Sequence, residues 1–114
     1  MLTFEELRTK NALRCECGFR HKLTDWSPSQ WTNAINGEVG ELCSLVKDKF
    51  DRGEDMLALR GRPMPTITQI SDEIADVLIY LDLLAASLKI SLDEAVRSKF
   101  NRTSEKIGSP IRLQ

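Results

Sequence analysis

The chain has 114 residues, 41% apolar and 29% charged, which suits a single domain over residues 1–114 with one modest core. Its 16 basic and 17 acidic residues give a formal charge of −1, which provides no general attraction to nucleic acid or to an anionic membrane. No apolar run approaches the roughly 20 residues of a membrane span, and the start MLTFEELRTK lacks a signal peptide's hydrophobic stretch. We therefore expect a cytoplasmic protein with no nucleic-acid or membrane partner, and with its cysteines as free thiols.

The first two predicted helices cover about residues 4–14 and 28–50. Each is preceded by a residue that can cap a helix N-terminus, followed three residues later by Glu or Gln, which can complete a capping box. These pairs are Thr3 with Glu6, and Ser27 with Gln30. Pro28 suits the first position of a helix, and Gly18 and Gly53 can end the two helices.

The segment 52–66 contains two glycines and two prolines, so we expect a loop that holds at most one short turn. A third helix is predicted over about 67–89, and a fourth over about 92–106. The signals that begin and end the fourth helix are Ser91 with Glu94, and Gly108 with Pro110.

The third predicted helix is apolar nearly all round. Leu78, Leu81 and Ala85 lie on a different side from Leu83 and Ile79. Because one small chain can hardly cover both sides, their burial requires a partner chain. The sequence therefore predicts an all-α bundle of about four helices, completed by oligomerisation into a homodimer or a homotetramer built as a dimer of dimers.

Two pairs of acids interrupt the apolar faces of the two longest predicted helices. Glu73 and Asp76 in EIADVLIYLDLL, and Glu38 and Glu41 in GEVGEL, are each three residues apart and therefore about 60° apart on a helix. Both pairs share a face with apolar residues, so four carboxylates are expected to converge between the helices. Such charges repel one another unless divalent cations bind. Oxygen ligands favour Mg²⁺ or Mn²⁺, and Mg²⁺ commonly shares its ligand shell with substrate phosphates, which predicts a phosphate ester as substrate.

Other interpretations stay open. A Glu-x-x-Glu pair is often a solvated face or a partner of lysines, so a non-catalytic helical interaction module is an alternative. A di-iron carboxylate site requires histidines on its helices, whereas the one histidine, His21, lies outside both long helices. Gly37 and Gly40 indicate close approach of a helix, a metal or a ligand. Cys15 and Cys17 could hold zinc with His21, but they form no Cys-x-x-Cys and no fourth ligand is evident.

The segments GEVGEL, DEIADVLIYLDLLA and LDEAVRSKFNRTSEKIGSP, within about residues 26–110, resemble the MazG-like nucleoside triphosphate pyrophosphohydrolases of the all-α NTP pyrophosphatase superfamily. Phage-encoded members in particular resemble DWSPSQWTNAINGE and KFNRTSEKIG, and that origin would imply the host cytoplasm. The resemblance implies a hydrolase that cleaves (deoxy)nucleoside triphosphates to the monophosphate and pyrophosphate. It also implies that Mg²⁺ is bound by Glu38, Glu41, Glu73 and Asp76, and that water attacks the α-phosphorus with Glu38 or Glu41 as the base.

Further residues are candidates for contact with the nucleotide, by their position near helix ends or near the acids, and Lys99 with Asn101 also matches the downstream motif of the family. The phosphate-binding candidates are Lys49, Lys99, Arg102 and Lys106, and the base- or sugar-binding candidates are Trp31, Asn101 and Tyr80. Gly37 stands where many relatives have a further glutamate, which leaves the number of ions per site open. Asp48 stands where relatives that prefer dCTP tend to carry an aromatic residue. We therefore expect a slight preference for a purine dNTP such as dGTP or dATP, with a dCTP- or dUTP-specific pyrophosphatase as the alternative.

Overall fold

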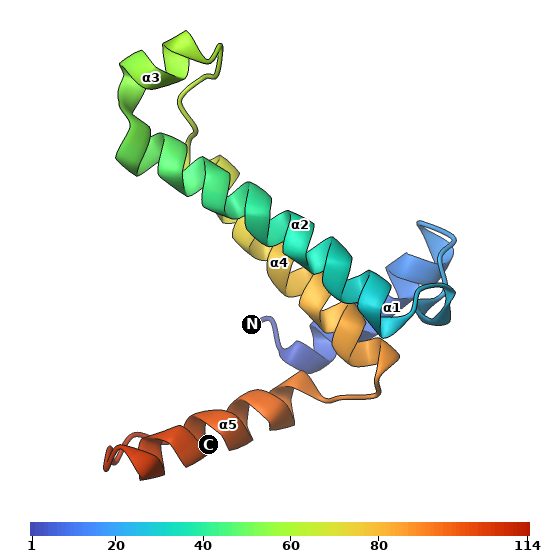
Figure 1. The fold of residues 1–114 in the computed structure, drawn as a ribbon. Helices are drawn as coiled ribbons and strands as arrows, with labels where there is room; N and C mark the ends of the chain where they lie inside the picture. The colour runs from blue at the N-terminus through green and yellow to red at the C-terminus, as the bar shows by residue number, and fades with distance from the viewer. The chain divides into compact units, whose positions relative to one another are not determined.

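A computed structural model describes residues 1–114, and it consists of helices and their connections without any β-strand. In chain order the elements are α1 (Phe4–Cys17), the 3₁₀ turn η1 (Leu23–Asp25), α2 (Pro28–Lys47), the π-helical turn η2 (Asp48–Arg52), α3 (Gly53–Leu59), α4 (Ile67–Ser87) and α5 (Leu92–Lys106) (Figure 1). The prediction of an all-α fold is confirmed. None of the helices combines the length and the apolar character needed to cross a membrane.

Side-chain caps begin most of the helices. The three predicted caps form, because the hydroxyl groups of Thr3, Ser27 and Ser91 accept hydrogen bonds from the backbone amides of Glu6, Gln30 and Glu94. A further capping box begins α4: Thr66 Oγ1 accepts from the Gln69 amide at 3.1 Å, and Gln69 Oε1 accepts from the Thr66 amide at 2.8 Å. This box explains why α4 starts directly after the proline-rich segment.

Gly18 ends α1 as predicted, although the helix continues to Cys17 rather than to about residue 14. α2 ends at Lys47 and η2 follows, where a helix to about residue 50 is predicted. The prediction of a loop over 52–66 was wrong, because this segment contains the helix α3. Both prolines of that segment, Pro63 and Pro65, come after α3, so they do not interrupt its hydrogen bonds. Leu57, which is 1% exposed, anchors the short helix.

The chain divides into two compact units, and the division falls within α4. We call Trp26–Leu81 the central unit, and Met1–Asp25 with Asp82–Gln114 the terminal unit. The prediction of one domain over 1–114 stays a prediction.

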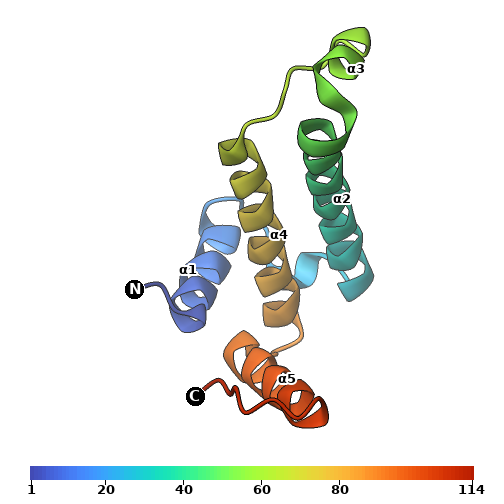
Figure 2. The same cartoon turned by 90° about the vertical axis from the view of Figure 1, so that its left-hand side faces the viewer.

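In the central unit, α2 and the first part of α4 lie side by side and run in opposite directions (Figures 1 and 2). Trp31 and Ile35 from α2 and Ile70 from α4 are buried. The Trp31 ring makes an edge contact with Trp26 at 4.7 Å between centroids and lies 6.5 Å from the Tyr80 ring. These apolar contacts fix which faces of α2 and α4 turn toward each other.

In the terminal unit, a buried ion pair joins α4 to α1. Asp82 is 0% exposed, and its carboxylate accepts hydrogen bonds from Arg8 Nε at 2.8 Å and Asn11 Nδ2 at 3.0 Å. Leu83 and Ala85, which follow on α4, are buried as well. Polar bonds and apolar packing together therefore hold the last turns of α4 within this unit.

The apolar surface of α4 is only partly covered. Ile74, Leu78 and Leu81 are 55%, 41% and 39% exposed, and at about 100° per residue they form one stripe on the helix. The exposure agrees with the expectation that one chain cannot bury every apolar side of this helix. The homodimer or homotetramer stays a prediction.

Candidate metal centre

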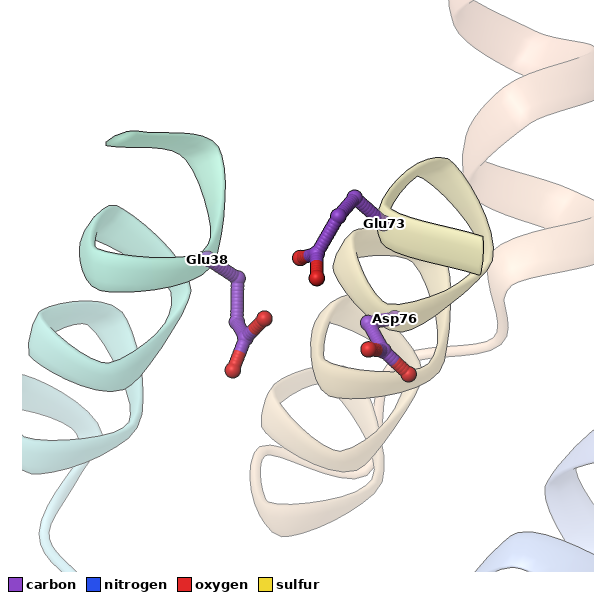
Figure 3. Close-up of side chains that lie close together, drawn as sticks. All are labelled: Glu38, Glu73 and Asp76. Carbon is purple, nitrogen blue, oxygen red and sulfur yellow. The ribbon is translucent and has the colours of Figure 1, made fainter. Parts of the chain in front are cut away.

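Three of the four predicted metal ligands lie close together in the central unit. Glu38 projects from the middle of α2, and Glu73 and Asp76 project from successive turns of α4 (Figure 3). One carboxylate oxygen from each of the three residues lies within 4.8 Å of the other two. We call Glu38, Glu73 and Asp76 the carboxylate cluster.

The helix period places these acids beside the buried apolar layer. Glu38 follows the buried Ile35 by three residues on α2, and Glu73 follows the buried Ile70 by three residues on α4. A residue three positions from a core residue lies about 60° from it, at the edge of the packed face. Glu38 and Glu73 are accordingly half-buried and face each other across the space between the helices (Figure 3).

No cation of the chain balances the carboxylate cluster. The arginines that form ion pairs bind other acids, namely Asp48, Asp82 and Asp93. Glu73 Oε2 is shielded from solvent and has no hydrogen-bond partner. The pKa of Glu73 is raised above its usual 4.5 by burial, then by the charge of Glu41 and by the interactions with Glu38 and Asp76. The site therefore holds excess negative charge.

This set of donors fits a hard divalent cation. The cluster offers only oxygen atoms, from two helices, and one of them is buried without a partner. Mg²⁺ and Mn²⁺ prefer such ligands, whereas zinc and iron sites in proteins commonly include histidine or cysteine. A bound cation would also neutralise the repulsion that raises the pKa of Glu73.

Glu41, the fourth predicted ligand, lies outside the carboxylate cluster and is exposed. It is nevertheless near enough for its charge to raise the pKa of Glu73. A Cβ atom at Gly37 or Gly40 would meet no other atom within 4 Å, so a tight helix crossing within the chain does not explain these glycines.

The predicted phosphate-binding residues are divided between the two units. Lys49 belongs to the central unit, and its Nζ donates to the Pro65 carbonyl oxygen at 3.2 Å. The other three, Lys99, Arg102 and Lys106, lie on α5 in the terminal unit, where Arg102 donates to the Ser98 hydroxyl. Their roles stay predictions.

The predicted nucleoside-binding residues already have protein partners. Trp31 is 2% exposed and packs near Trp26 and Tyr80, so stacking on a base would require these side chains to move. Asn101 binds the backbone of Leu113 twice, donating to its carbonyl at 3.0 Å and accepting from its amide at 2.8 Å. A nucleotide would have to displace that contact to reach the Asn101 amide.

The zinc alternative gains no support. Cys15 is buried, and its thiol donates to the His21 carbonyl at 2.9 Å, while Cys17 is exposed. Burial and the charges of Glu16 and Asp25 raise the pKa of the Cys15 thiol, which opposes the thiolate form that zinc binds. Cys15, Cys17 and His21 form no group comparable to the carboxylate cluster.

The sequence interpretation missed two buried acids, Asp48 and Asp82. Asp82 lies in EIADVLIYLDLL, about 180° around the helix from Glu73, and a charge at that position in an apolar segment signals a buried partner. Asp48 departs from the family pattern, and the structure adds that it is 1% exposed and binds Arg52 and Arg62.

The chain is similar to mammalian proteins named dCTP pyrophosphatase 1. The mouse protein is 35% identical over 93 residues, which make up 78% of this chain and 52% of the mouse protein. The human protein is 38% identical over 81 residues, 68% of this chain and 46% of the human protein. The chain therefore spans about half the length of the curated relatives that it matches. No protein-family model and no solved structure matches the chain. The similarity supports, at a coarse level, the resemblance to the MazG-like all-α NTP pyrophosphatases.

Proposed function

We propose that the chain hydrolyses deoxynucleoside triphosphates to the monophosphate and pyrophosphate, and that Glu38, Glu73 and Asp76 hold the divalent cation, Mg²⁺ or Mn²⁺, that this reaction uses. The observation that carries the proposal is the carboxylate cluster, with its oxygens within 4.8 Å of one another and no cationic side chain paired to it. The names of the relatives agree with the predicted enzyme class, a nucleotide pyrophosphohydrolase.

The residues of the site have separate roles in this proposal. When bound, a divalent cation supplies Lewis acidity, which neutralises phosphate charge and lowers the pKa of water. Glu38, Glu73 and Asp76 fix its position between α2 and α4. Glu41 is exposed beside the cluster without being part of it, and its carboxylate can accept the proton of the attacking water.

We propose a deoxyribose sugar in the substrate, and we assign no preferred base. The purine preference expected from Asp48 finds no support in the relatives, which are named for dCTP. The base in their name does not transfer directly to this chain either, because the family resemblance implies an aromatic residue at position 48, where this chain has Asp48 paired with Arg52 and Arg62. The proposal therefore covers deoxynucleoside triphosphates as a class.

The interaction-module alternative receives less support. It supposes that the acids pair with lysines, whereas no lysine or arginine forms an ion pair with Glu38, Glu41, Glu73 or Asp76 within the chain.

The test is an assay of pyrophosphate release from each common NTP and dNTP, with Mg²⁺, with Mn²⁺ and with EDTA. We expect cation-dependent release of pyrophosphate together with the monophosphate, identified by chromatography. Release of orthophosphate alone, turnover that persists in EDTA, or no turnover by folded protein would contradict the proposal. Rates across the substrates identify the preferred base.

A further inference from the structure

We propose that Arg62 binds the outer phosphates of a nucleoside triphosphate, at the opposite end of the carboxylate cluster from Trp31. This inference rests on the proposed function. All the residues involved belong to the central unit.

The order of groups along α2 gives the first argument. Trp31, Glu38 and Ser44 follow one another at intervals of seven and six residues, or about 10 Å and about 9 Å along the helix axis. Around the helix Ser44 lies about 60° from Glu41 and about 120° from Glu38, so it is one turn beyond Glu41 and on the flank of the helix next to the carboxylate cluster. Along the axis of α2, the carboxylates and then the Arg62 guanidinium follow one another in the order of a cation-bound phosphate and the outer phosphates.

The contacts of Arg62 give the second argument. Its Nη2 donates to Ser44 Oγ at 2.8 Å and lies 2.6 Å from Asp48 Oδ2. The Arg62 side chain is still 40% exposed, and only this nitrogen of the guanidinium has a side-chain partner. A guanidinium carries five N–H groups, so most of its donors stay available to a phosphate.

The charge of the surrounding group gives the third argument. Asp48 is buried and pairs with both Arg52 and Arg62, so this group of three carries a net charge of +1 (two arginines minus one aspartate). That charge lies one to two turns along α2 from Glu41. It favours a polyphosphate at a place where the acids alone would repel it.

The backbone of Arg62 is also fixed. α3 ends in a turn in which the Gly61 amide donates to Ala58 and the Arg62 amide donates to the Leu57 carbonyl at 2.8 Å. Gly61 has φ of +65°, a conformation that favours glycine at this position of a helix C-cap. Since Leu57 is buried, α3 holds Arg62 in place. Lys49, which is the one predicted phosphate ligand in this unit, instead donates to Pro65.

The test measures binding of inorganic tripolyphosphate in Mg²⁺ by calorimetry, for the wild type, Arg62→Gln and Arg60→Gln. Arg60 is exposed, lies two residues away and is not among the arginines that form ion pairs, which makes it a matched control. We expect Arg62→Gln to weaken binding by about tenfold or more, the scale of a lost charge-assisted hydrogen bond. Arg60→Gln should change it by less than about twofold.

Arg62→Lys separates charge from shape. It keeps the positive charge without the planar fork, so we expect binding between that of the wild type and Arg62→Gln. Thermal unfolding of each variant verifies that α3 remains folded. The inference would be overturned if Arg60→Gln and Arg62→Gln lost equal affinity for tripolyphosphate, or if Arg62→Gln kept the affinity of the wild type. It would also be overturned if the wild type did not bind tripolyphosphate.

Kinetics distinguish this inference from the proposed function. Arg62→Gln should raise KM for the preferred dNTP while leaving the affinity for the dNMP product unchanged, because the monophosphate lacks the outer phosphates. If the wild type hydrolyses the dNTP and the KM of Arg62→Gln is unchanged, only the role of Arg62 is overturned. Arg62-dependent tripolyphosphate binding without turnover of any nucleotide overturns only the proposed reaction.

Discussion

Helix α4 carries acids in two different environments. Asp82 is fully buried in the terminal unit, and its carboxylate accepts hydrogen bonds from Arg8 and Asn11. Glu73 and Asp76, in the central unit, lie close to Glu38, and no lysine or arginine forms an ion pair with any of the three. A buried carboxylate whose partners are supplied by the chain contributes to the fold, whereas carboxylates that crowd together without a partner require one from outside. The absence of a partner therefore distinguishes a candidate site better than burial does.

The same contrast exists on the segment that begins with α2. Asp48 is buried and paired with two arginines, and Glu38 is half-buried and paired with none. Substitutions in the two kinds of site should therefore have different effects. Changes in the carboxylate cluster should lower activity, and changes at the paired, buried acids should lower stability.

The largest expected effect follows from Glu38→Gln. Loss of one cation ligand should lower dNTP hydrolysis by about 10³-fold or more, equivalent to about 4 kcal/mol. The free energy of unfolding without added cation should not fall, because one of several repelling charges is removed. Pyrophosphate release and urea unfolding measure the two quantities.

The control is Asp72→Asn, an exposed acid of α4 outside the cluster. Activity that survives in Glu38→Gln, or that falls equally in Asp72→Asn, would contradict the assignment.

The next effect is on stability, in Arg8→Met. Asp82 would stay buried with Asn11 as its remaining partner, and the free energy of unfolding at neutral pH should fall by about 3 kcal/mol. Urea unfolding measures the loss. The control is Lys10→Met, at an exposed position of the same helix, whose free energy of unfolding should be close to that of the wild type. Similar stabilities for the two variants would show that the buried pair contributes little.

A smaller effect is expected from added cation. Binding to the folded state alone stabilises it by about 2.7 kcal/mol at about 100 times Kd. Mg²⁺ and Mn²⁺ should therefore raise the Tm of the wild type, and should leave the Tm of a Glu38→Gln/Glu73→Gln double variant unchanged. An equal rise in both proteins would place the cation elsewhere.

The smallest expected effect is a pH dependence of the cation-free protein. Because the folded state raises the pKa of Glu73 above 4.5, it holds a proton that the unfolded chain has already released. The stability contributed by this group is present below pH 4.5 and is lost as the pH rises through the raised pKa. Glu73→Gln should accordingly gain stability relative to the wild type as the pH rises, measured by urea unfolding in EDTA. A difference that does not vary with pH would argue against the crowding of charges.

Local patterns predicted much of the fold. The caps of α1, α2 and α5 depend on residues three apart, which can be recognised in the sequence. The prolines of the segment 52–66 predict a loop, but they lie after α3 and therefore do not prevent this short helix.

The candidate site was partly predictable for the same reason. Glu38, Glu73 and Asp76 each lie on an inward side that the helix period defines, so pairing two long helices was enough to bring them together. Contacts between distant residues could not be predicted in this way. Arg8 and Asp82 are 74 positions apart, and Arg62 reaches Ser44 across 18, so these partners depend on how the chain returns on itself.

The most direct test of the uncompensated carboxylate cluster is a titration with Mn²⁺, followed by the electron paramagnetic resonance signal of the free ion. We predict that the wild type binds Mn²⁺, that Mg²⁺ competes for the same site, and that a folded Glu38→Gln/Glu73→Gln variant does not remove the free-ion signal. A wild type that leaves the signal unchanged, or a double variant that binds as tightly as the wild type, would contradict the account.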